Sequence, residues 1–223
     1  KDERVIEKLP LPLSIIATDI GTGQRVVLRE GSLTSAMRAS MSVPGLLSPI
    51  VLDGRKLVDG GLVDNVPIAE ARERCKADIV IAVNVGSPLM DADRVGSLLT
   101  ISAQMVNILT EQNVTRSLAT LKPTDILIQP DLGTISSTDF SRNGEAADRG
   151  RAAAEAVRVQ LAGLGADETR YAEWRKPINR RNKPAMTVNE IEIAGLKRVN
   201  PAMVERQLTV RTGEPLANSN IDN

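Results

Sequence analysis

An acidic residue followed by two glycines, at the end of a short apolar run, is the feature around which this sequence is organised. Asp59, Gly60 and Gly61 come directly after Val58. Glycine has no β-carbon and can adopt positive φ, so the backbone after Asp59 can approach another group closely. We expect a strand that ends at Asp59 and a helix that begins at Pro67. Taken alone, the pattern also fits a solvated acid in an ordinary strand–loop–helix connection.

Turn signals predict how the chain reaches this acid. Asp53-Gly54 lies between two apolar runs, which is a strong signal for a β-hairpin. A hairpin over residues 49–58 would place Asp59 at the end of its second strand. A second hairpin is predicted over residues 13–29.

Helical and apolar segments alternate through the rest of the chain. Helices are predicted over residues 34–41, 67–75, 95–121 and 145–161, and apolar strands over residues 78–85 and 125–128. The nearly continuous apolar run at 78–85 is typical of a strand buried on both faces of a parallel sheet. We therefore expect an α/β fold with a mixed, mainly parallel sheet flanked by helices.

The composition narrows the chemistry that this chain can supply. It contains no histidine, which excludes a Ser-His-Asp or Cys-His mechanism built from these residues and a typical histidine-bearing zinc site. No metal and no cofactor is expected. Lys+Arg and Asp+Glu both number 28, so nucleic acid is not expected as a partner. Cys75 is alone, which rules out an intrachain disulfide.

No targeting or membrane-spanning segment is visible in the sequence. A run of 18 apolar residues does not occur, and no signal peptide is recognisable. The first residue is Lys1 rather than methionine. We therefore expect that the chain begins inside a longer protein.

The composition changes near residue 175. Residues 175–184 include five basic residues, no acidic residue and two prolines. We interpret residues 175–187 as a basic, proline-bounded linker, with a patch for nucleic acid or anionic lipid as the alternative. Apolar and polar residues then alternate over 188–195, which predicts a half-exposed strand. The expected domains are residues 1–174, this linker, and the start of a second domain at 188–223.

Several short sequence motifs surround Asp59. They are Ala17-Thr18-Asp19, Thr22-Gly23, Arg38-Ala39-Ser40-Met41-Ser42-Val43-Pro44-Gly45, Asp53-Gly54-Arg55, Val58-Asp59-Gly60-Gly61 and Asn65-Val66-Pro67. In this order and spacing they resemble the C-terminal part of the lipase domain of bacterial patatin-like phospholipases. The resemblance implies a patatin-like α/β fold that is truncated at its N-terminal side.

The resemblance also implies an activity, which is hydrolysis of lipid acyl esters by a Ser–Asp dyad that uses no histidine. The catalytic aspartate of that family corresponds to Asp59, with Gly60 and Gly61 as supporting motif residues. A lipid or phospholipid substrate, contact with a membrane surface and a homo-oligomer are the partners that we consider. No Gly-x-Ser-x-Gly motif occurs in the chain, so it would supply only the aspartate, and we expect these residues alone to be inactive.

The tail has a resemblance of its own. Val188, Ile191, Ile193, Gly195 and Val199 follow a spacing similar to the opening of a POTRA domain. This implies an outer-membrane barrel domain downstream and a location in the outer membrane, or secretion, in a Gram-negative bacterium. An unrelated β–α segment is the alternative.

Two other functions fit parts of the sequence. A secretion or interaction module without catalysis could dock through the POTRA-like strand by strand addition. A nucleotide-binding α/β domain is the other, although the chain lacks a Gly-x-Gly-x-x-Gly motif after a strand.

Overall fold

The computed structural model describes residues 4–86, 89–136, 139–179, 187–192, 208 and 211–213. The chain divides into two units, Lys1–Ala166 and Asp167–Asn223. We describe each unit by itself.

A four-stranded antiparallel sheet forms the first part of unit 1. Its strands are β1 (Ile15–Asp19), β2 (Arg25–Leu28), β3 (Ile50–Leu52) and β4 (Arg55–Asp59), in the order β2-β1-β4-β3. Both predicted hairpins are confirmed, β1 with β2 and β3 with β4. The two hairpins join where β1 pairs with β4, with Ala17 opposite Asp59. Asp59 is therefore the last residue of an inner strand.

The turn between β3 and β4 explains why the second hairpin could be predicted. Asp53 and Gly54 have φ values of 48° and 75°. Two consecutive residues with positive φ form the tight turn whose twist matches that of paired strands, and Asp-Gly is a preferred sequence for it. The local sequence thus fixes the register that brings Asp59 to the end of β4.

Helix α1 (Leu33–Ser40) packs on one face of this sheet. Ser32 caps it, because its hydroxyl accepts a hydrogen bond from the Ser35 N–H at 3.1 Å. Small residues let the helix approach the strands closely. The core between them consists of Ala17, Val26, Ala39 and Leu57, with Leu28, Ile50 and Leu52 packed against it.

Two short helices follow Asp59, and only one of them was predicted. The four-residue helix α2 (Gly61–Asp64) lies where the sequence indicated a loop. Helix α3 (Ile68–Cys75) begins directly after Pro67, as expected. Helix α2 packs against both β1 and the long helix α4 (Leu98–Leu118), so the segment after Asp59 is held between a strand and a helix.

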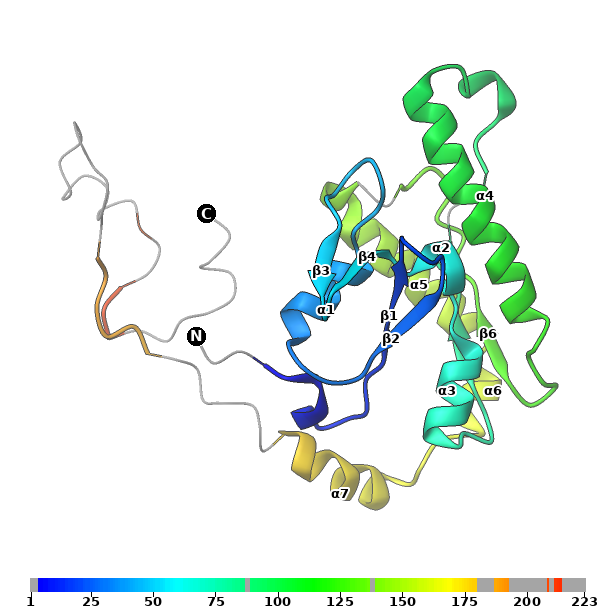
Figure 1. The fold of residues 1–223 in the computed structure, drawn as a ribbon. Coiled ribbons are helices and arrows are strands. Elements are labelled where there is room, and N and C mark those ends of the chain that lie inside the picture. Colours follow the sequence, from blue (N-terminus) through cyan, green and yellow to red (C-terminus); the bar gives the residue numbers. More distant parts are fainter. Residues whose placement is uncertain are drawn as a thin grey trace. The chain divides into compact units, whose positions relative to one another are not determined.

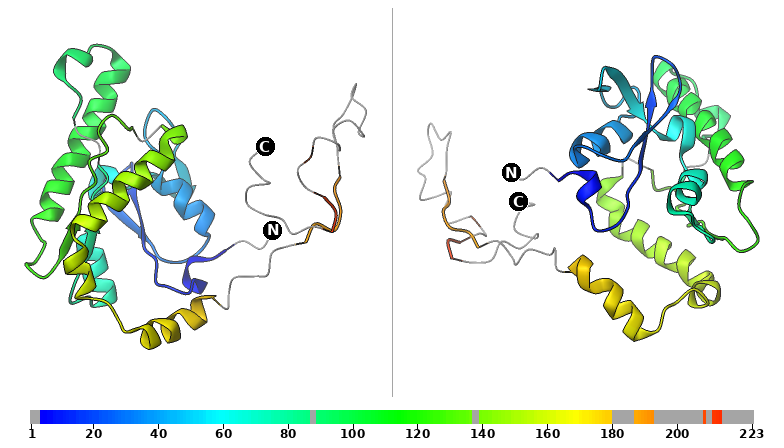
Figure 2. Two further views of the ribbon diagram at one scale, coloured as in Figure 1. Left: turned by 180° about the vertical axis from the view of Figure 1, so that it is seen from behind. Right: turned by 60° about the horizontal axis from the view of Figure 1, so that its bottom comes forward.

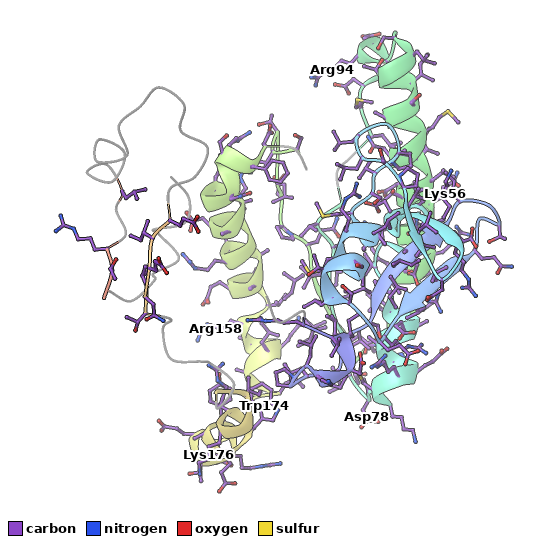
Figure 3. The ribbon with its side chains drawn as sticks, turned by 60° about the vertical axis from the view of Figure 1, so that its left-hand side comes forward. Lys56, Asp78, Arg94, Arg158, Trp174 and Lys176 are labelled. Atoms are coloured by element: carbon purple, nitrogen blue, oxygen red, sulfur yellow. The ribbon has the colours of Figure 1, made fainter. Side chains whose placement is uncertain are left out.

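A second core lies around the parallel strands β5 (Ile81–Val83) and β6 (Ile126–Ile128). It contains Val66, Ile68, Val80, Ala82 and Val114, with Ala77, Leu118, Leu121 and Leu127 packed against it. Only the second half of α4 contributes to this core. The first turns of α4, which follow Arg94, project beyond the sheets and leave Leu98 and Met105 largely exposed (Figure 1, Figure 3).

The structure combines helices and sheets as expected, but the prediction of a mixed, mainly parallel sheet is wrong for the described strands: the four-stranded sheet is entirely antiparallel, and the parallel strands β5 and β6 form a separate sheet. Three strand pairs are antiparallel and one is parallel. Short turns join β1 to β2 and β3 to β4, which makes these pairs antiparallel, whereas a helical crossover separates β5 from β6. Burial of the 78–85 strand on both faces is also wrong: Ile81 and Val83 are 47% and 51% exposed, while Ala82 between them is buried.

The remaining regular elements of unit 1 among the described residues are helices (Figure 2). The predicted helix over 145–161 is two helices, α5 (Asn143–Ala156) and α6 (Arg158–Ala162), separated at Val157. Single-turn helices occupy Ile6–Lys8, Ala92–Arg94 and Phe140–Arg142. Within the described ranges, no helix combines the length and the apolar character needed to cross a bilayer.

Unit 2 begins with helix α7 (Glu168–Asn179), from which Trp174 and Lys176 project (Figure 3). The Tyr171 and Trp174 rings contact each other, with centroids 5.8 Å apart. Residues 175–179 of the predicted linker are helical, and residues 180–186 lie outside the described residues. Of the predicted strand over 188–195, the structure describes 188–192, which form no strand; the POTRA-like helix lies outside the described residues apart from position 208.

Candidate active site

The backbone of Asp59 is held on both sides by buried residues. Its N–H donates to the Ser42 carbonyl at 3.0 Å, and its carbonyl accepts a hydrogen bond from the Thr18 hydroxyl at 2.7 Å. Thr18 and Ser42 are both buried. Buried hydrogen bonds of this kind are costly to break, so they fix the position of the Asp59 backbone.

The carboxylate of Asp59 is half-buried, and only one of its two oxygens accepts a hydrogen bond from the described residues. Its Oδ1 accepts a hydrogen bond from the Gly61 N–H at 2.7 Å. Its Oδ2 makes no hydrogen bond within the described part of the chain. Burial raises the pKa of Asp59, and the Gly61 hydrogen bond partly opposes this change. The result is a fixed carboxylate that is more basic than a solvated one and has one oxygen free to accept a proton.

Gly60 is required for a steric reason. A β-carbon at this position would lie 2.2 Å from the carbonyl oxygen of Ile16, a contact that real β-carbons do not make. Its φ is −71°, so the left-handed conformation that a Gly-Gly pair permits is not used here. A β-carbon on Gly61 would lie 2.9 Å from Asp59 Oδ1. Both glycines serve close approach, as the sequence predicted.

The segment after α1 forms the support for the end of β4. Ser40 and Ser42 offer their backbone carbonyls to the N–H groups of Gly60 and Asp59, at 3.4 and 3.0 Å. The Ser42 hydroxyl donates to the Arg38 carbonyl at 2.6 Å and also accepts a hydrogen bond from the Arg38 guanidinium. The sequence block at 38–45 is therefore joined to the Asp59 block through backbone hydrogen bonds.

The neighbouring acids have other roles. Asp19 accepts a hydrogen bond from the Gly21 N–H at 2.9 Å within its turn, and Asp53 forms the β3–β4 turn. Asp64 pairs with Arg25 at 2.6 Å. Asp64 thus has an ion-pair partner, and Asp19 and Asp53 lie in turns, whereas Asp59 lies at the end of an inner strand.

Asn113 is a site residue that sequence reasoning missed. It lies on α4 and is only 3% exposed. Its side chain bonds the Gly61 carbonyl and the Asn65 N–H, at 2.7 and 2.9 Å. The sequence carries one weak signal for it, a polar residue between the apolar Leu109 and Val114 of a predicted helix.

The described residues show no arrangement for a metal: no group of three or more His, Cys, Asp or Glu side chains comes together among them. A shallow pocket of about 350 Å³ lies beside α2 and α4. It is lined by Arg25, Val63, Asp64, Ala69, Asn113, Arg116, Ser117 and Thr120. Asp59 is not among its lining residues, so this pocket is separate from the free carboxylate oxygen.

The segment that contains the site is similar to known proteins. Residues 3–72 match the family model described as patatin-like phospholipase. An uncharacterized NTE family protein of Mycobacterium tuberculosis is 40% identical over 92 residues. Patatin-like phospholipase domain-containing proteins of Caenorhabditis elegans and of Mus musculus (number 7) are 46% and 44% identical over 88 and 87 residues. The predicted resemblance is confirmed for this segment.

The similarity covers only part of each protein. The segment matched by the Mycobacterium tuberculosis protein makes up 40% of this chain and 25% of that protein. The segments matched by the Caenorhabditis elegans and Mus musculus proteins make up 39% and 38% of this chain, and 6% of each of those proteins. The matched residues 3–72 include Asp59, the two glycines and the supporting Thr18 and Ser42. Asn113 lies outside them.

Proposed function

We propose that this chain is part of a lipid acyl-ester hydrolase in which Asp59 is the general base of a Ser–Asp dyad. The observation that carries the proposal is the state of the Asp59 carboxylate: half-buried, with Oδ1 fixed by the Gly61 N–H at 2.7 Å and Oδ2 free. The match of residues 3–72 to the patatin-like phospholipase family supports a lipid ester as the substrate class.

The proposed reaction begins with a serine that these 223 residues do not supply in a Gly-x-Ser-x-Gly motif. Its hydroxyl oxygen attacks the ester carbonyl carbon while its proton passes to Asp59 Oδ2. The tetrahedral intermediate then expels the alcohol, which takes the proton from Asp59. Water attacks the acyl-serine, with Asp59 again accepting a proton, and the fatty acid is released as the serine regains its hydrogen.

A raised pKa suits this role. A general base must be ionised before the reaction and must bind a proton firmly during it. Burial favours proton binding by Asp59, and the Gly61 hydrogen bond keeps the ionised form accessible. Asp59 can accept the serine proton directly, so the scheme needs no histidine as an intermediate base.

The test compares two Asp→Asn changes in the full-length protein. Asp59→Asn keeps the acceptor for the Gly61 N–H and removes the base; Asp53→Asn makes the same chemical change at an exposed turn position. Hydrolysis of a short-chain aryl ester and of phosphatidylcholine vesicles is measured. We expect Asp59→Asn to lower kcat by about 10²–10⁴-fold and Asp53→Asn to leave it unchanged.

Wild-type turnover by Asp59→Asn would disprove the role of Asp59. An inactive wild-type protein on both substrates would disprove the activity itself. The 223 residues expressed alone should be inert in the same assays; turnover by them would show that the chain contains a nucleophile of its own.

A further inference from the structure

Asn113 is a buried polar residue whose hydrogen-bonding groups are all used. Its Nδ2 donates to the carbonyls of Gly61 and Leu109, at 2.7 and 2.9 Å, and its Oδ1 accepts from the Asn65 N–H at 2.9 Å. Burial of an amide is unfavourable unless such partners are present. Asn113 therefore occupies a site that is built for an amide side chain.

The contacts also define which way the amide faces. Exchanging its oxygen and nitrogen would place a carbonyl-type oxygen against the Gly61 and Leu109 carbonyls and an NH₂ group against the Asn65 N–H. All three contacts would become repulsive. The donor of Asn113 thus faces Gly61, and its acceptor faces Asn65.

These bonds hold helix α2 at both ends. Gly61 is its first residue, and Asn65 follows its last residue. The Gly61 carbonyl accepts a hydrogen bond from Asn113 Nδ2. The N–H of the same residue donates to Asp59 Oδ1 at 2.7 Å. A continuous series of hydrogen bonds therefore runs from Asn113 on α4 through Gly61 to the carboxylate of Asp59.

We propose that Asn113 is a positioning residue for Asp59: by fixing Gly61 and Asn65, it aims the Gly61 N–H at Asp59 Oδ1 and leaves Oδ2 free to accept a proton. This inference rests on the proposed function, because it assigns a purpose to the geometry of Asp59. Other residues already fix the backbone of Asp59, so the specific contribution of Asn113 is the orientation and basicity of the carboxylate.

Three variants of the full-length protein test this role. Asn113→Leu removes all three hydrogen bonds at similar volume. Asn113→Asp keeps the acceptor for the Asn65 N–H and replaces the donor to Gly61 with an oxygen. The matched control is Asn107→Leu, the same change at a half-buried position of α4 whose side chain makes no hydrogen bond among the described residues. Hydrolysis of a short-chain aryl ester is measured from pH 4 to pH 9, with circular dichroism to verify folding.

We expect both Asn113 variants to lower kcat by about 10–100-fold with little change in KM, because the base is misaligned while substrate binding is untouched. In Asn113→Leu the acid limb of the pH–rate profile should move to higher pH. The Gly61 hydrogen bond lowers the pKa of Asp59, and weakening it leaves the raising effect of burial unopposed. Asn107→Leu should match the wild type in rate and profile.

The outcomes separate this inference from the proposed function. If the wild type hydrolyses the ester and Asp59→Asn does not, but folded Asn113 variants keep the wild-type rate and profile, the role of Asn113 is disproved and that of Asp59 stands. Failure of both Asn113 variants to fold would also count against positioning, because Asn113 would then serve global stability. An inactive wild type would refute the proposed function first.

Discussion

The carbonyl oxygen of Ile16 lies 2.2 Å from the point that a β-carbon would occupy on Gly60. This contact makes β1 and the residue after β4 so close that only a hydrogen atom fits between them. This steric restriction explains the glycine at position 60 better than any property of the loop does.

Gly60→Ala should therefore be strongly destabilising. We expect the free energy of unfolding to fall by about 3 kcal/mol, because the added methyl group meets backbone that cannot move without breaking the β1–β4 pairing. Urea denaturation of the 223-residue chain measures this. Gly150→Ala is the control, since nothing lies within 4 Å of its added carbon and it sits inside α5, where alanine should stabilise by about 1 kcal/mol. Equal effects of the two changes would contradict the steric argument.

Asp59 should make the folded chain less stable as pH rises. Its folded pKa is raised above the unfolded value, so the folded state holds its proton more tightly. The stability that this supplies is fully present below the unfolded pKa and is lost as pH rises through the folded pKa. Asp59→Asn should thus gain stability relative to the wild type at pH 7 but not at pH 3.

The measurement is urea unfolding at the two pH values, with Asp53→Asn compared in parallel. A wild-type chain that is as stable as Asp59→Asn at pH 7, or more stable, would show that burial does not penalise the ionised carboxylate.

Asp125 should have the opposite effect. Hydrogen bonds from the Lys122 and Val80 N–H groups and from Arg72 lower its pKa from 3.8 to about 2, against the effect of burial. The stability that the carboxylate supplies is present above the unfolded pKa and is lost as pH falls from about 4 to 2. Asp125→Asn should lower the Tm at pH 7, and its difference from the wild type should shrink as the pH falls toward 2. A Tm difference that is the same at both pH values would contradict this assignment.

The local parts of the fold could be predicted because local chemistry determines them. Asp53-Gly54 specifies a tight turn, and Pro67 marks a helix start by its effect on the nearest backbone. The pairing of β1 with β4 has no such signal, since it joins strands that are distant in sequence. The prediction of a mainly parallel sheet failed because apolar runs indicate burial but do not indicate the direction of the partner strand.

The candidate site divides in the same way. Asp59 and its glycines could be recognised from adjacent residues, whereas the role of Asn113 depends on a contact with Gly61 across 52 positions of sequence. Ser40 supports the site through its backbone carbonyl, a group that every residue carries and that no sequence pattern marks. The POTRA-like tail, the downstream barrel and the outer-membrane or secreted location rest on the pattern of residues 188–199 and stay predictions.

The junction of the two hairpins has a consequence for the order of folding. Each hairpin closes a short loop and can form rapidly on its own, but β1 meets β4 only after a longer segment has been ordered. The Thr18 contact to Asp59 depends on that late step, because Thr18 lies on β1. A chain whose two hairpins have formed but not yet paired would contain most of its strands. Asp59 would not yet be held in its native position. Recovery of the environment of Asp59 during refolding should therefore lag behind recovery of secondary structure.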